Sequence, residues 1–289
     1  LAVFLFMNHS LLRPEYLLRP SNLLRRLFLR QLWRRRDVVV RLKNGYQIAV
    51  REGEFIGNNI INTRCYDAPL GEFLWRLVRQ GDTCIDVGAN IGYVTLLMAA
   101  QCSPSGNCIS FEADPSLFHQ LVENVGQNHI SHITLVNAAV SDKNGMLSFL
   151  KADKLNMGLG RVVIEPTSSS VQISAVRLDE YFAKLNCARV VKIDVEGHEL
   201  QVLKGMSAAL EAKKVENVVF EEHGGAGAES LEFLHKFGYT IFRLERGLRG
   251  PRLVVPDMAV IKDLEPNFVA TLDPSGLHDL INVPGWHIF

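Results

Sequence analysis

Short apolar runs alternate with longer amphipathic segments from residue 83 to residue 261. The apolar runs have the length of buried strands, and the segments between them have the spacing of helices. We expect strands at Thr83–Val87, Cys108–Glu112, Ile133–Asn137, Val190–Val195, Val218–Glu221, Thr240–Leu244 and Met258–Ile261. We expect helices at Tyr93–Gln101, Ser116–Gln127, Leu178–Leu185, Glu199–Glu211 and Ser230–Phe237. This alternation predicts an α/β fold with a doubly wound, mostly parallel, seven-stranded sheet that helices cover on both faces.

Two other stretches add to this pattern. Residues Asp37–Val50 predict a β-hairpin with Asn44-Gly45 at its turn, and a helix is expected around Leu70–Arg79. Residues Met146–Ile173 are polar and contain Gly and Ser, and they interrupt the alternation. We expect them to form a hairpin insertion near the functional site.

The first 36 residues form a strongly basic segment. They carry a net charge of +7, whereas the remainder of the chain carries −7. Apolar residues between Ser21 and Arg36 recur on one helical stripe, which predicts an amphipathic helix. Such a helix packs on its own domain, packs on a second subunit in a homodimer, or makes a peripheral membrane contact. We divide the chain into an N-terminal helical extension (1–37), a main domain (38–262) and a C-terminal tail (263–289).

Composition narrows the class of protein and its surroundings. The mildly acidic main domain argues against a nucleic-acid partner. The five cysteines are odd in number and form no C-x-x-C pair, so we expect a reducing, cytoplasmic setting without a disulfide framework. No run approaches the roughly 18 apolar residues of a membrane span.

The segment that follows the first expected strand has the pattern of a ligand-binding turn. Asp86 ends a buried strand, and Gly88, Asn90 and Gly92 lie in the turn before a helix. A dinucleotide site requires G-x-G-x-x-G, whereas these glycines are spaced G-x-x-x-G. Because Asp86 would repel a diphosphate, the turn favours a ligand with a cationic end, such as S-adenosylmethionine.

Residues at the next two strand ends extend this cofactor site. Glu112 follows Gly92 by 20 residues and ends the second strand, where a carboxylate binds ribose hydroxyls. Adenine is expected over the third strand end, where Ala138 and Ala139 permit close approach and either Ser141 or Asp142 reaches the exocyclic amine.

A second motif lies on the fourth expected strand. Strand residues alternate between faces, so Lys192, Asp194 and Glu196 point to one side. Ionisable groups on a central strand must pair with each other or with a ligand, because burial of an unpaired charge is costly.

Taken together, the segments DVGANIGY and VVKIDVEGHE resemble the FkbM family of methyltransferases. The resemblance runs from about Val38 to Ile261. It implies a class I, Rossmann-like fold, S-adenosylmethionine as cofactor, and O-methylation of a sugar or natural-product hydroxyl. It identifies as cofactor contacts Asp86, Gly88, Asn90, Gly92 and Glu112, and as further motif positions Lys192, Asp194, Glu196 and Glu199. His198 stands where many members carry a small residue.

The chemistry of hydroxyl methylation requires a group that takes a proton. Asp194 is the first candidate, with Lys192 holding it ionised; the other candidates are Glu196, His198 and residues 221–223. No metal is expected, although a divalent ion between Asp194 and a fifth-strand carboxylate is the alternative. Two other functions fit the pattern less well: a non-catalytic cofactor-binding subunit and a nicotinamide-dependent oxidoreductase.

Overall fold

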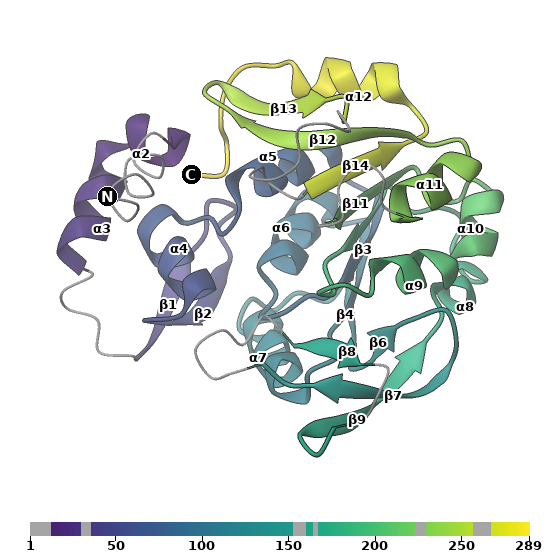
Figure 1. Ribbon diagram of the computed structural model, residues 1–289. Helices are drawn as coiled ribbons and strands as arrows, with labels where there is room; N and C mark the ends of the chain where they lie inside the picture. The colour runs from purple at the N-terminus through teal and green to yellow at the C-terminus, as the bar shows by residue number, and fades with distance from the viewer. Residues whose placement is uncertain (1–12, 30–35, 153–159, 164–166, 223–228, 257–266) are drawn as a thin grey trace, which may run out of the picture.

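The computed structural model describes residues 13–29, 36–152, 160–163, 167–222, 229–256 and 267–289. Among them, eight strands form one large sheet in the order β13-β12-β14-β11-β10-β3-β4-β5 (Figure 1). These strands are β3 (Thr83–Val87), β4 (Asn107–Phe111), β5 (Ile133–Val136), β10 (Val190–Ile193), β11 (Asn217–Glu221), β12 (Thr240–Gly247), β13 (Gly250–Val254) and β14 (Asn267–Thr271).

The sheet has a parallel half and an antiparallel edge. Strands β5, β4, β3, β10 and β11 run parallel, whereas β14 pairs antiparallel with both β11 and β12, and β13 pairs antiparallel with β12. The chain proceeds outward from β3 in one direction and from β10 in the other. The boundary between β3 and β10 is therefore the topological switch point, beyond which ligands bind in open α/β sheets.

Helices cover both faces of the sheet, as the alternation predicted (Figure 1). Adjacent strand residues point to opposite faces, and each face has its own core: Cys84 and Val190 belong to one, and their neighbours Ile85 and Val191 to the other. The first core packs against α4 (Phe55–Thr63), α5 (Ala68–Leu77), α6 (Tyr93–Cys102), α7 (Pro115–Gly126) and α12 (Pro274–Ile281). The second packs against α8 (Leu178–Phe182), α9 (Glu199–Lys204), α10 (Ser207–Glu211) and α11 (Glu229–Lys236).

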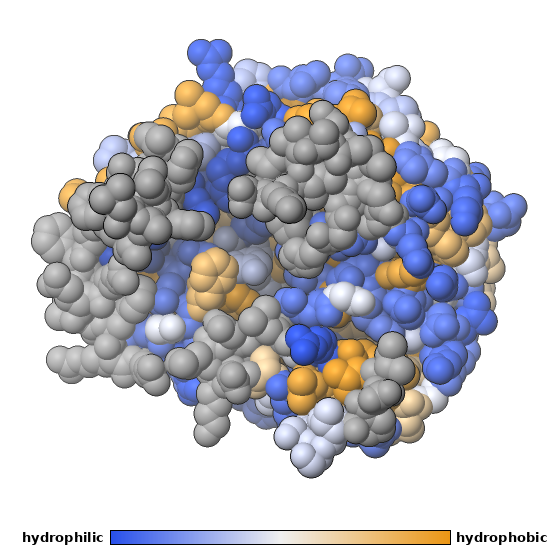
Figure 2. Space-filling view, in the orientation of Figure 1, coloured by the Kyte–Doolittle hydropathy of each residue, from blue (hydrophilic) through white to orange (hydrophobic). Residues whose placement is uncertain are grey.

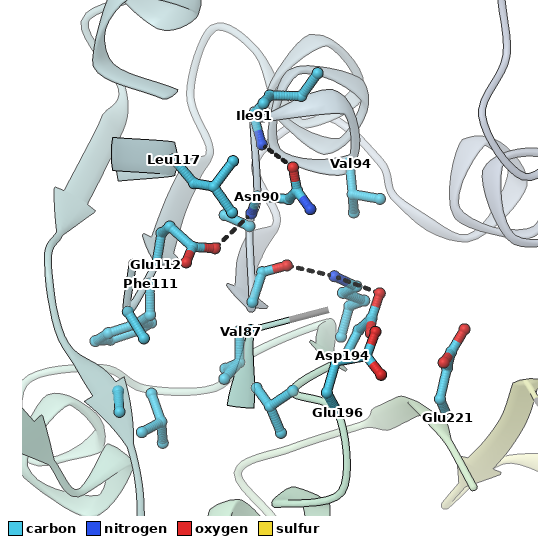
Figure 3. A pocket seen from close by; sticks show the side chains of 18 of the residues that line it. Val87, Asn90, Ile91, Val94, Phe111, Glu112, Leu117, Asp194, Glu196 and Glu221 are labelled. Atoms are coloured by element: carbon cyan, nitrogen blue, oxygen red, sulfur yellow. Dashed lines mark hydrogen bonds and ion pairs between the residues drawn. The ribbon is translucent and has the colours of Figure 1, made fainter. Parts of the chain in front are cut away.

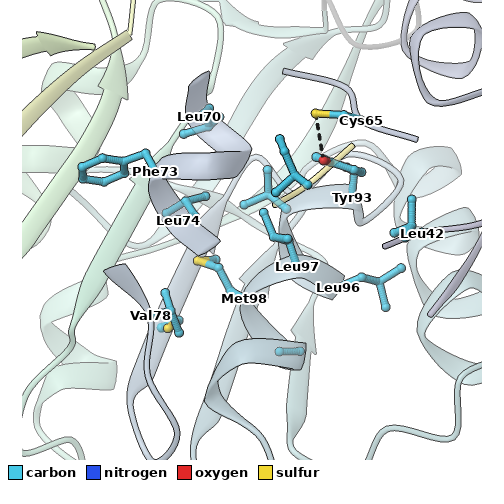
Figure 4. Close-up of a cluster of buried hydrophobic side chains, with 14 of the residues drawn as sticks. Leu42, Cys65, Leu70, Phe73, Leu74, Val78, Tyr93, Leu96, Leu97 and Met98 are labelled. Carbon is cyan, nitrogen blue, oxygen red and sulfur yellow. Dashed lines mark hydrogen bonds between the residues drawn. The ribbon is translucent and has the colours of Figure 1, made fainter. Parts of the chain in front are cut away.

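The outer surfaces and the interior of these layers follow the usual division of polar and apolar residues. Figure 2 shows a mostly hydrophilic surface over α8–α11, whose apolar sides face the sheet. In the first core, Leu74 of α5 lies next to Met98 of α6, and both are fully buried (Figure 4).

The C-terminal part of the sheet differs from the expected one. The expected strand Met258–Ile261 lies outside the described residues, while β14 begins at Asn267 and inserts between β11 and β12. The sheet therefore includes residues that the sequence pattern had assigned to a C-terminal tail, and β13 gives it an eighth strand.

The expected helix at Glu199–Glu211 is two helices, α9 and α10. A Cβ on Gly205, between them, would lie 2.0 Å from the carbonyl oxygen of Ser141. The backbone approaches a neighbouring loop too closely there for any other residue, and this contact accompanies the break between the helices.

The interruption at residues 146–173 is a second, smaller sheet in the order β6-β9-β7-β8. Its long antiparallel pair joins β7 (Gly145–Leu150) to β9 (Ser170–Val176), which confirms the expected hairpin insertion. The short strands β6 (Ala139–Val140) and β8 (Arg161–Val163) complete it.

Before the main sheet come a hairpin and two helices. Strands β1 (Asp37–Arg41) and β2 (Gln47–Arg51) pair antiparallel, and Gly45 has a φ of 90° in the turn, which confirms that prediction. The helices are α2 (Pro14–Leu17) and α3 (Pro20–Leu29); α3 covers the first part of the expected amphipathic helix, and residues 30–35 lie outside the described ones.

Helix α2 packs on its own domain. The Tyr16 side chain is buried, and Glu15 forms a 2.6 Å ion pair with Arg246 of β12, far along the chain. Asn22 of α3 donates a hydrogen bond to the carbonyl of Glu15. No helix in the described part of the chain is long and apolar enough to cross a membrane.

Candidate functional site

A cavity of about 340 Å³ lies at the carboxyl ends of the parallel strands, at the switch point. Its floor consists of the residues that follow β3, β4, β10 and β11. The first turn of α4 forms one wall, and the second sheet forms another through Phe149, Gly160 and Val162. The insertion thus lies near the site, as expected.

The turn after β3 requires both of its glycines. Gly88 and Gly92 have φ values of 78° and 96°, in the left-handed region that side chains disfavour. A Cβ on Gly88 would lie 1.8 Å from the carbonyl oxygen of Asp194, so this turn touches the end of β10. Asn90, also left-handed at 52°, accepts a hydrogen bond on its side chain from the Ile91 amide at 2.8 Å (Figure 3).

Glu112 is buried at the end of β4 and lines the cavity. Its two oxygens accept the backbone amides of Asn90 at 2.7 Å and of Asp114 at 2.8 Å. Burial raises the pKa of Glu112 to about 7, against the opposing effect of these two amides. Each carboxylate oxygen has two lone pairs, so the group can still accept bonds from ligand hydroxyls.

Asp86 occupies a different place from the expected one. Its side chain is fully buried below the cavity and does not line it. Thr95 donates to it at 2.7 Å, and the ammonium of Lys192 lies 3.2 Å away. Strand β3 turns Asp86 toward Lys192 of the adjacent strand, with which it is in register, so the expected direct contact of Asp86 with the cationic end of the cofactor stays a prediction.

Lys192 joins the glycine turn to the acids of β10. Its ammonium donates to the carbonyl of Gly88 at 2.8 Å and lies 3.6 Å from Asp194. Burial lowers the pKa of Lys192, but the charges of Asp86 and Asp194 outweigh this effect and the net pKa is raised. Lys192 is therefore a charged, positioning residue that connects both halves of the cavity.

Glu196 lines the cavity and lies in a turn whose backbone is strained. Its φ is 54°, a left-handed value that costs a residue with a side chain about 1–3 kcal/mol. Glu199, which the motif marked without a role, accepts the amides of Val195 and Gly197 at 3.2 Å each. Glu199 thereby holds the backbone amides of the two residues on either side of Glu196.

The structure brings three carboxylates together at one end of the cavity: Asp194, Glu196 and Glu221. Figure 3 shows them on one side, with Glu112 and Asn90 on the other. Burial, followed by the charges of Asp194 and Glu196, raises the pKa of Glu221 to about 8. Glu222 does not line the cavity, and His223 lies outside the described residues.

Tyr66 completes this end, and no sequence motif contains it. It follows α4, lines the cavity, and meets Phe55 and Tyr93 edge to face at ring distances of 6.3 and 6.4 Å. Tyr93 in turn donates to the sulfur of Cys65 at 3.2 Å (Figure 4). We name Tyr66, Asp194, Glu196 and Glu221 the acceptor end.

The remaining expected residues divide into two groups. Ala139 and His198 line the cavity. Asp142 does not line it, and its carboxylate accepts a hydrogen bond from the Ser141 hydroxyl at 3.0 Å. His198 lies 3.0 Å from the same hydroxyl, and burial lowers its pKa.

Within the described residues, no three His, Cys, Asp or Glu side chains are placed to hold a metal ion.

The other end of the cavity suits S-adenosylmethionine. Glu112 has carboxylate oxygens of the kind that accept ribose hydroxyls, and the small residues Ala138 and Ala139, with Leu117, form an apolar surface of the kind that adenine packs against. The fold, the glycine turn, this cavity and the family match given next define a class I, Rossmann-like methyltransferase with S-adenosylmethionine as its cofactor.

Comparison with known proteins gives the family. The family model for the methyltransferase FkbM domain matches residues 86–241, more than half of the chain, so the chain belongs to the FkbM methyltransferase family. This membership excludes the alternative of a nicotinamide-dependent oxidoreductase.

Individual proteins and one solved structure are similar to parts of this chain. The hexuronic acid methyltransferase AglP of Haloferax volcanii is 36% identical over 152 residues, which cover 53% of this chain and 60% of that protein, less than two thirds of its length. The 31-O-demethyl-FK506 methyltransferase FkbM of Streptomyces tacrolimicus is 29% identical over 71% of this chain and 90% of its own. Among solved structures, the methyltransferase FkbM of Methylobacillus flagellatus aligns with a TM-score of 0.42 and 15% identity, over 74% of this chain and 52% of that one.

Proposed function

We propose that the protein transfers a methyl group from S-adenosylmethionine to a hydroxyl oxygen of a sugar or natural-product acceptor. One observation carries this proposal: a single cavity holds the carboxylate of Glu112, which we assign to the ribose, at one end and three further carboxylates at the other. Cofactor and acceptor can therefore meet in one enclosed space, and the acids supply a group that takes the hydroxyl proton.

We assign the proton transfer to Glu221. S-adenosylmethionine supplies a methyl group that is already activated on a sulfonium sulfur. Glu221 takes the hydroxyl proton as the oxygen attacks the methyl carbon and the carbon–sulfur bond breaks. Its pKa of about 8 lies close to neutral pH, where a general base works best.

Asp194, the first candidate from the sequence, has a different role in this proposal. Its carboxylate is already engaged with the Lys192 ammonium at 3.6 Å. Its backbone carbonyl meets the glycine turn, so its position is fixed relative to the cofactor end. Asp194 accepts a hydrogen bond from the acceptor and orients it, and Glu196 acts alongside it.

The names of the relatives support oxygen as the site of methylation. One relative is named for hexuronic acid and the other for a demethylated oxygen of FK506. Both names describe oxygen-rich acceptors of small-molecule or carbohydrate type.

The test uses S-adenosylmethionine with a deuterated methyl group and a panel of sugar glycosides and macrolides. We expect a mass increase of one labelled methyl group in an acceptor, and fragmentation or NMR that places it on a hydroxyl oxygen. Labelling on nitrogen or carbon, or no labelling of any hydroxyl compound, would contradict the proposal.

A further inference from the structure

One aromatic side chain is exposed at the rim of the cavity. Phe55 is the first residue of α4, lines the cavity and is 64% exposed. The other phenylalanines that line the cavity in the described part of the chain, Phe111 and Phe149, are buried. Covering an exposed apolar ring removes it from water, so a molecule that packs on Phe55 gains binding free energy.

The backbone around Phe55 is held in place. A Cβ on Gly57, in the first turn of α4, would lie 2.1 Å from the carbonyl oxygen of Arg51, so this turn packs directly on the end of β2. The Gly53 amide donates a hydrogen bond to the side chain of Asn58 at 2.9 Å, which ties the preceding loop to the same helix. Because these contacts already fix the backbone, little conformational entropy is lost when a ligand packs on the ring.

The Phe55 ring is also the outer member of a row of three aromatic rings. It meets Tyr66 at a centroid distance of 6.3 Å and an interplanar angle of 89°, and Tyr66 meets Tyr93 at 6.4 Å and 77°. Tyr93 is buried and donates to the sulfur of Cys65 at 3.2 Å, which anchors the row in the core. An edge-to-face contact covers at most one face of a ring, so Tyr66 leaves at least one face of Phe55 uncovered.

Tyr66 places this row at the acceptor end. Burial, followed by the charge of Asp194, raises the pKa of Tyr66, so its hydroxyl stays protonated and both donates and accepts hydrogen bonds. Tyr66 and Asp194 both line the cavity. An acceptor hydroxyl near Asp194 would therefore lie close to Tyr66, with the Phe55 ring beside it at the rim.

The chemistry of this corner indicates the shape of its ligand. An open aromatic face binds apolar C–H surface, while the Tyr66 hydroxyl and the carboxylates bind hydroxyl groups. A saturated ring with hydroxyl substituents offers both, because its hydroxyls lie around the edge and its C–H bonds form a face. An open-chain polyol has no such face. The ring face carries no charge, so this contact suits rings with or without a carboxylate substituent.

We propose that Phe55 is a specificity-determining residue that packs against one face of a hydroxylated ring in the acceptor. This inference rests on the proposed function and names the substrate class of the same site: cyclic molecules that combine hydroxyl groups with a C–H face. Phe55 holds the ring while Tyr66 and Asp194 bind its hydroxyls, and the reacting hydroxyl is turned toward the cofactor.

A first experiment measures turnover with an acceptor that the deuterated-methyl panel identifies. F55A should raise the KM of this acceptor about tenfold or more and change kcat by less than about threefold, because it loses the ring contact and keeps the acids. F55Y keeps an aromatic face and should restore KM to within about threefold of wild type. V122A, which shortens an exposed apolar side chain on α7, is the control and should leave KM unchanged. A wild-type acceptor KM in F55A overturns the proposal.

Calorimetry with S-adenosylhomocysteine separates this role from a role in cofactor binding. F55A should bind S-adenosylhomocysteine within about threefold of the wild-type affinity. A loss of this affinity as large as the rise in acceptor KM would place Phe55 at the cofactor and overturn the proposal.

A second experiment needs no turnover. The full chain carries para-fluorophenylalanine in place of phenylalanine and is saturated with S-adenosylhomocysteine, and the fluorine NMR resonance that is absent from F55Y identifies Phe55. The probes are the glycosides and macrolides of the panel, with sorbitol as an open-chain polyol. We expect at least one ring compound to shift the Phe55 resonance and sorbitol at equal concentration to leave it in place. No shift with any ring compound, or an equal shift with sorbitol, overturns the proposal.

The outcomes separate this inference from the proposed function. If a hydroxyl is methylated and F55A keeps the wild-type acceptor KM, methylation of oxygen stands and the role of Phe55 fails. If ring compounds shift the Phe55 resonance but none is methylated on a hydroxyl, the ring contact stands and the result counts against hydroxyl methylation.

Discussion

At the scale of single residues, the main feature of this site is a buried lysine that pairs with the acids around the cavity. Lys192 is the one described cation among the acids of the cavity, and it bridges Asp86 below the floor, Gly88 in the turn and Asp194 beside the acceptor. Because a buried charge is tolerated only when it is paired, this bridge explains why the motif contains a lysine within a buried strand. It also fixes the spacing between the two ends of the cavity.

Glu112 provides the most direct residue-level test of the cofactor end. Loss of charged hydrogen bonds to the ribose in Glu112→Ala should weaken S-adenosylhomocysteine binding by about 1.5–3 kcal/mol. Calorimetry measures this change, and Glu123→Ala, an exposed acid on α7, serves as the control. An unchanged dissociation constant in Glu112→Ala would show that ribose binds elsewhere.

Glu221 provides the test of the proton acceptor. Because Glu221 must be ionised to take a proton and its pKa is about 8, wild-type kcat should rise with pH through this value. Glu221→Gln should lower kcat by roughly 10²–10⁴-fold, remove the rise with pH, and leave cofactor affinity nearly unchanged. If Asp194→Asn instead removes the rise while Glu221→Gln retains it, Asp194 is the base.

The same variant has a predicted effect on stability. The folded pKa of Glu221 is raised from 4.5 to about 8, so its contribution to stability is present below pH 4.5 and is lost as pH rises through 8. Glutamine does not titrate, so the variant does not lose this contribution. The melting temperature of Glu221→Gln should therefore rise relative to that of the wild type as the pH increases from 5 to 9.

Spacing along the sequence identified which residues lie at strand ends, but not where their side chains point. Gly88, Asn90 and Glu112 line the cavity, as turn geometry and strand ends led us to expect, whereas Gly92 shapes the turn without lining the cavity. The orientation of Asp86 could not be predicted because its register with Lys192 depends on a strand that lies about 100 residues later. Similarly, nothing local marks Tyr66, which reaches the cavity only through the packing of α4 and α5 against the sheet.

At the scale of elements, the short turn between β10 and α9 controls the acceptor end. Glu199→Ala removes the acceptor of two amides, which should cost about 1–3 kcal/mol of unfolding free energy and release Glu196. We therefore expect kcat to fall while cofactor affinity stays close to wild type. Urea unfolding and kinetics check this, with Glu211→Ala as the control; full activity in Glu199→Ala would mean that the geometry of Glu196 is unimportant.

Helix α2 is a second element with a testable role. Glu15 and Arg246 form a largely buried ion pair, with side chains 8% and 16% exposed. Glu15→Ala leaves Arg246 without this partner and should lower the free energy of unfolding by about 1–3 kcal/mol. Arg19→Ala, on the exposed side, should have little effect. Equal stability of the two variants would indicate that α2 contributes little to the domain.

At the scale of the whole molecule, the parallel half of the sheet and strand β12 were predictable, whereas β13 and the place of β14 were not. Parallel strands are buried on both faces and appear as continuous apolar runs, which located β3, β4, β5, β10 and β11 within a few residues. The place of β14 between β11 and β12 is a long-range pairing that no local pattern specifies. The cavity depends on the predictable half, and this is why the sequence located its floor.

One measurement tests the central claim most directly: calorimetric titration of the full chain with S-adenosylhomocysteine and, separately, with NAD⁺. The G-x-x-x-G turn and Glu112 predict that S-adenosylhomocysteine binds at one site per chain and that NAD⁺ gives no binding heat. Tight binding of NAD⁺ with no response to S-adenosylhomocysteine would contradict the account.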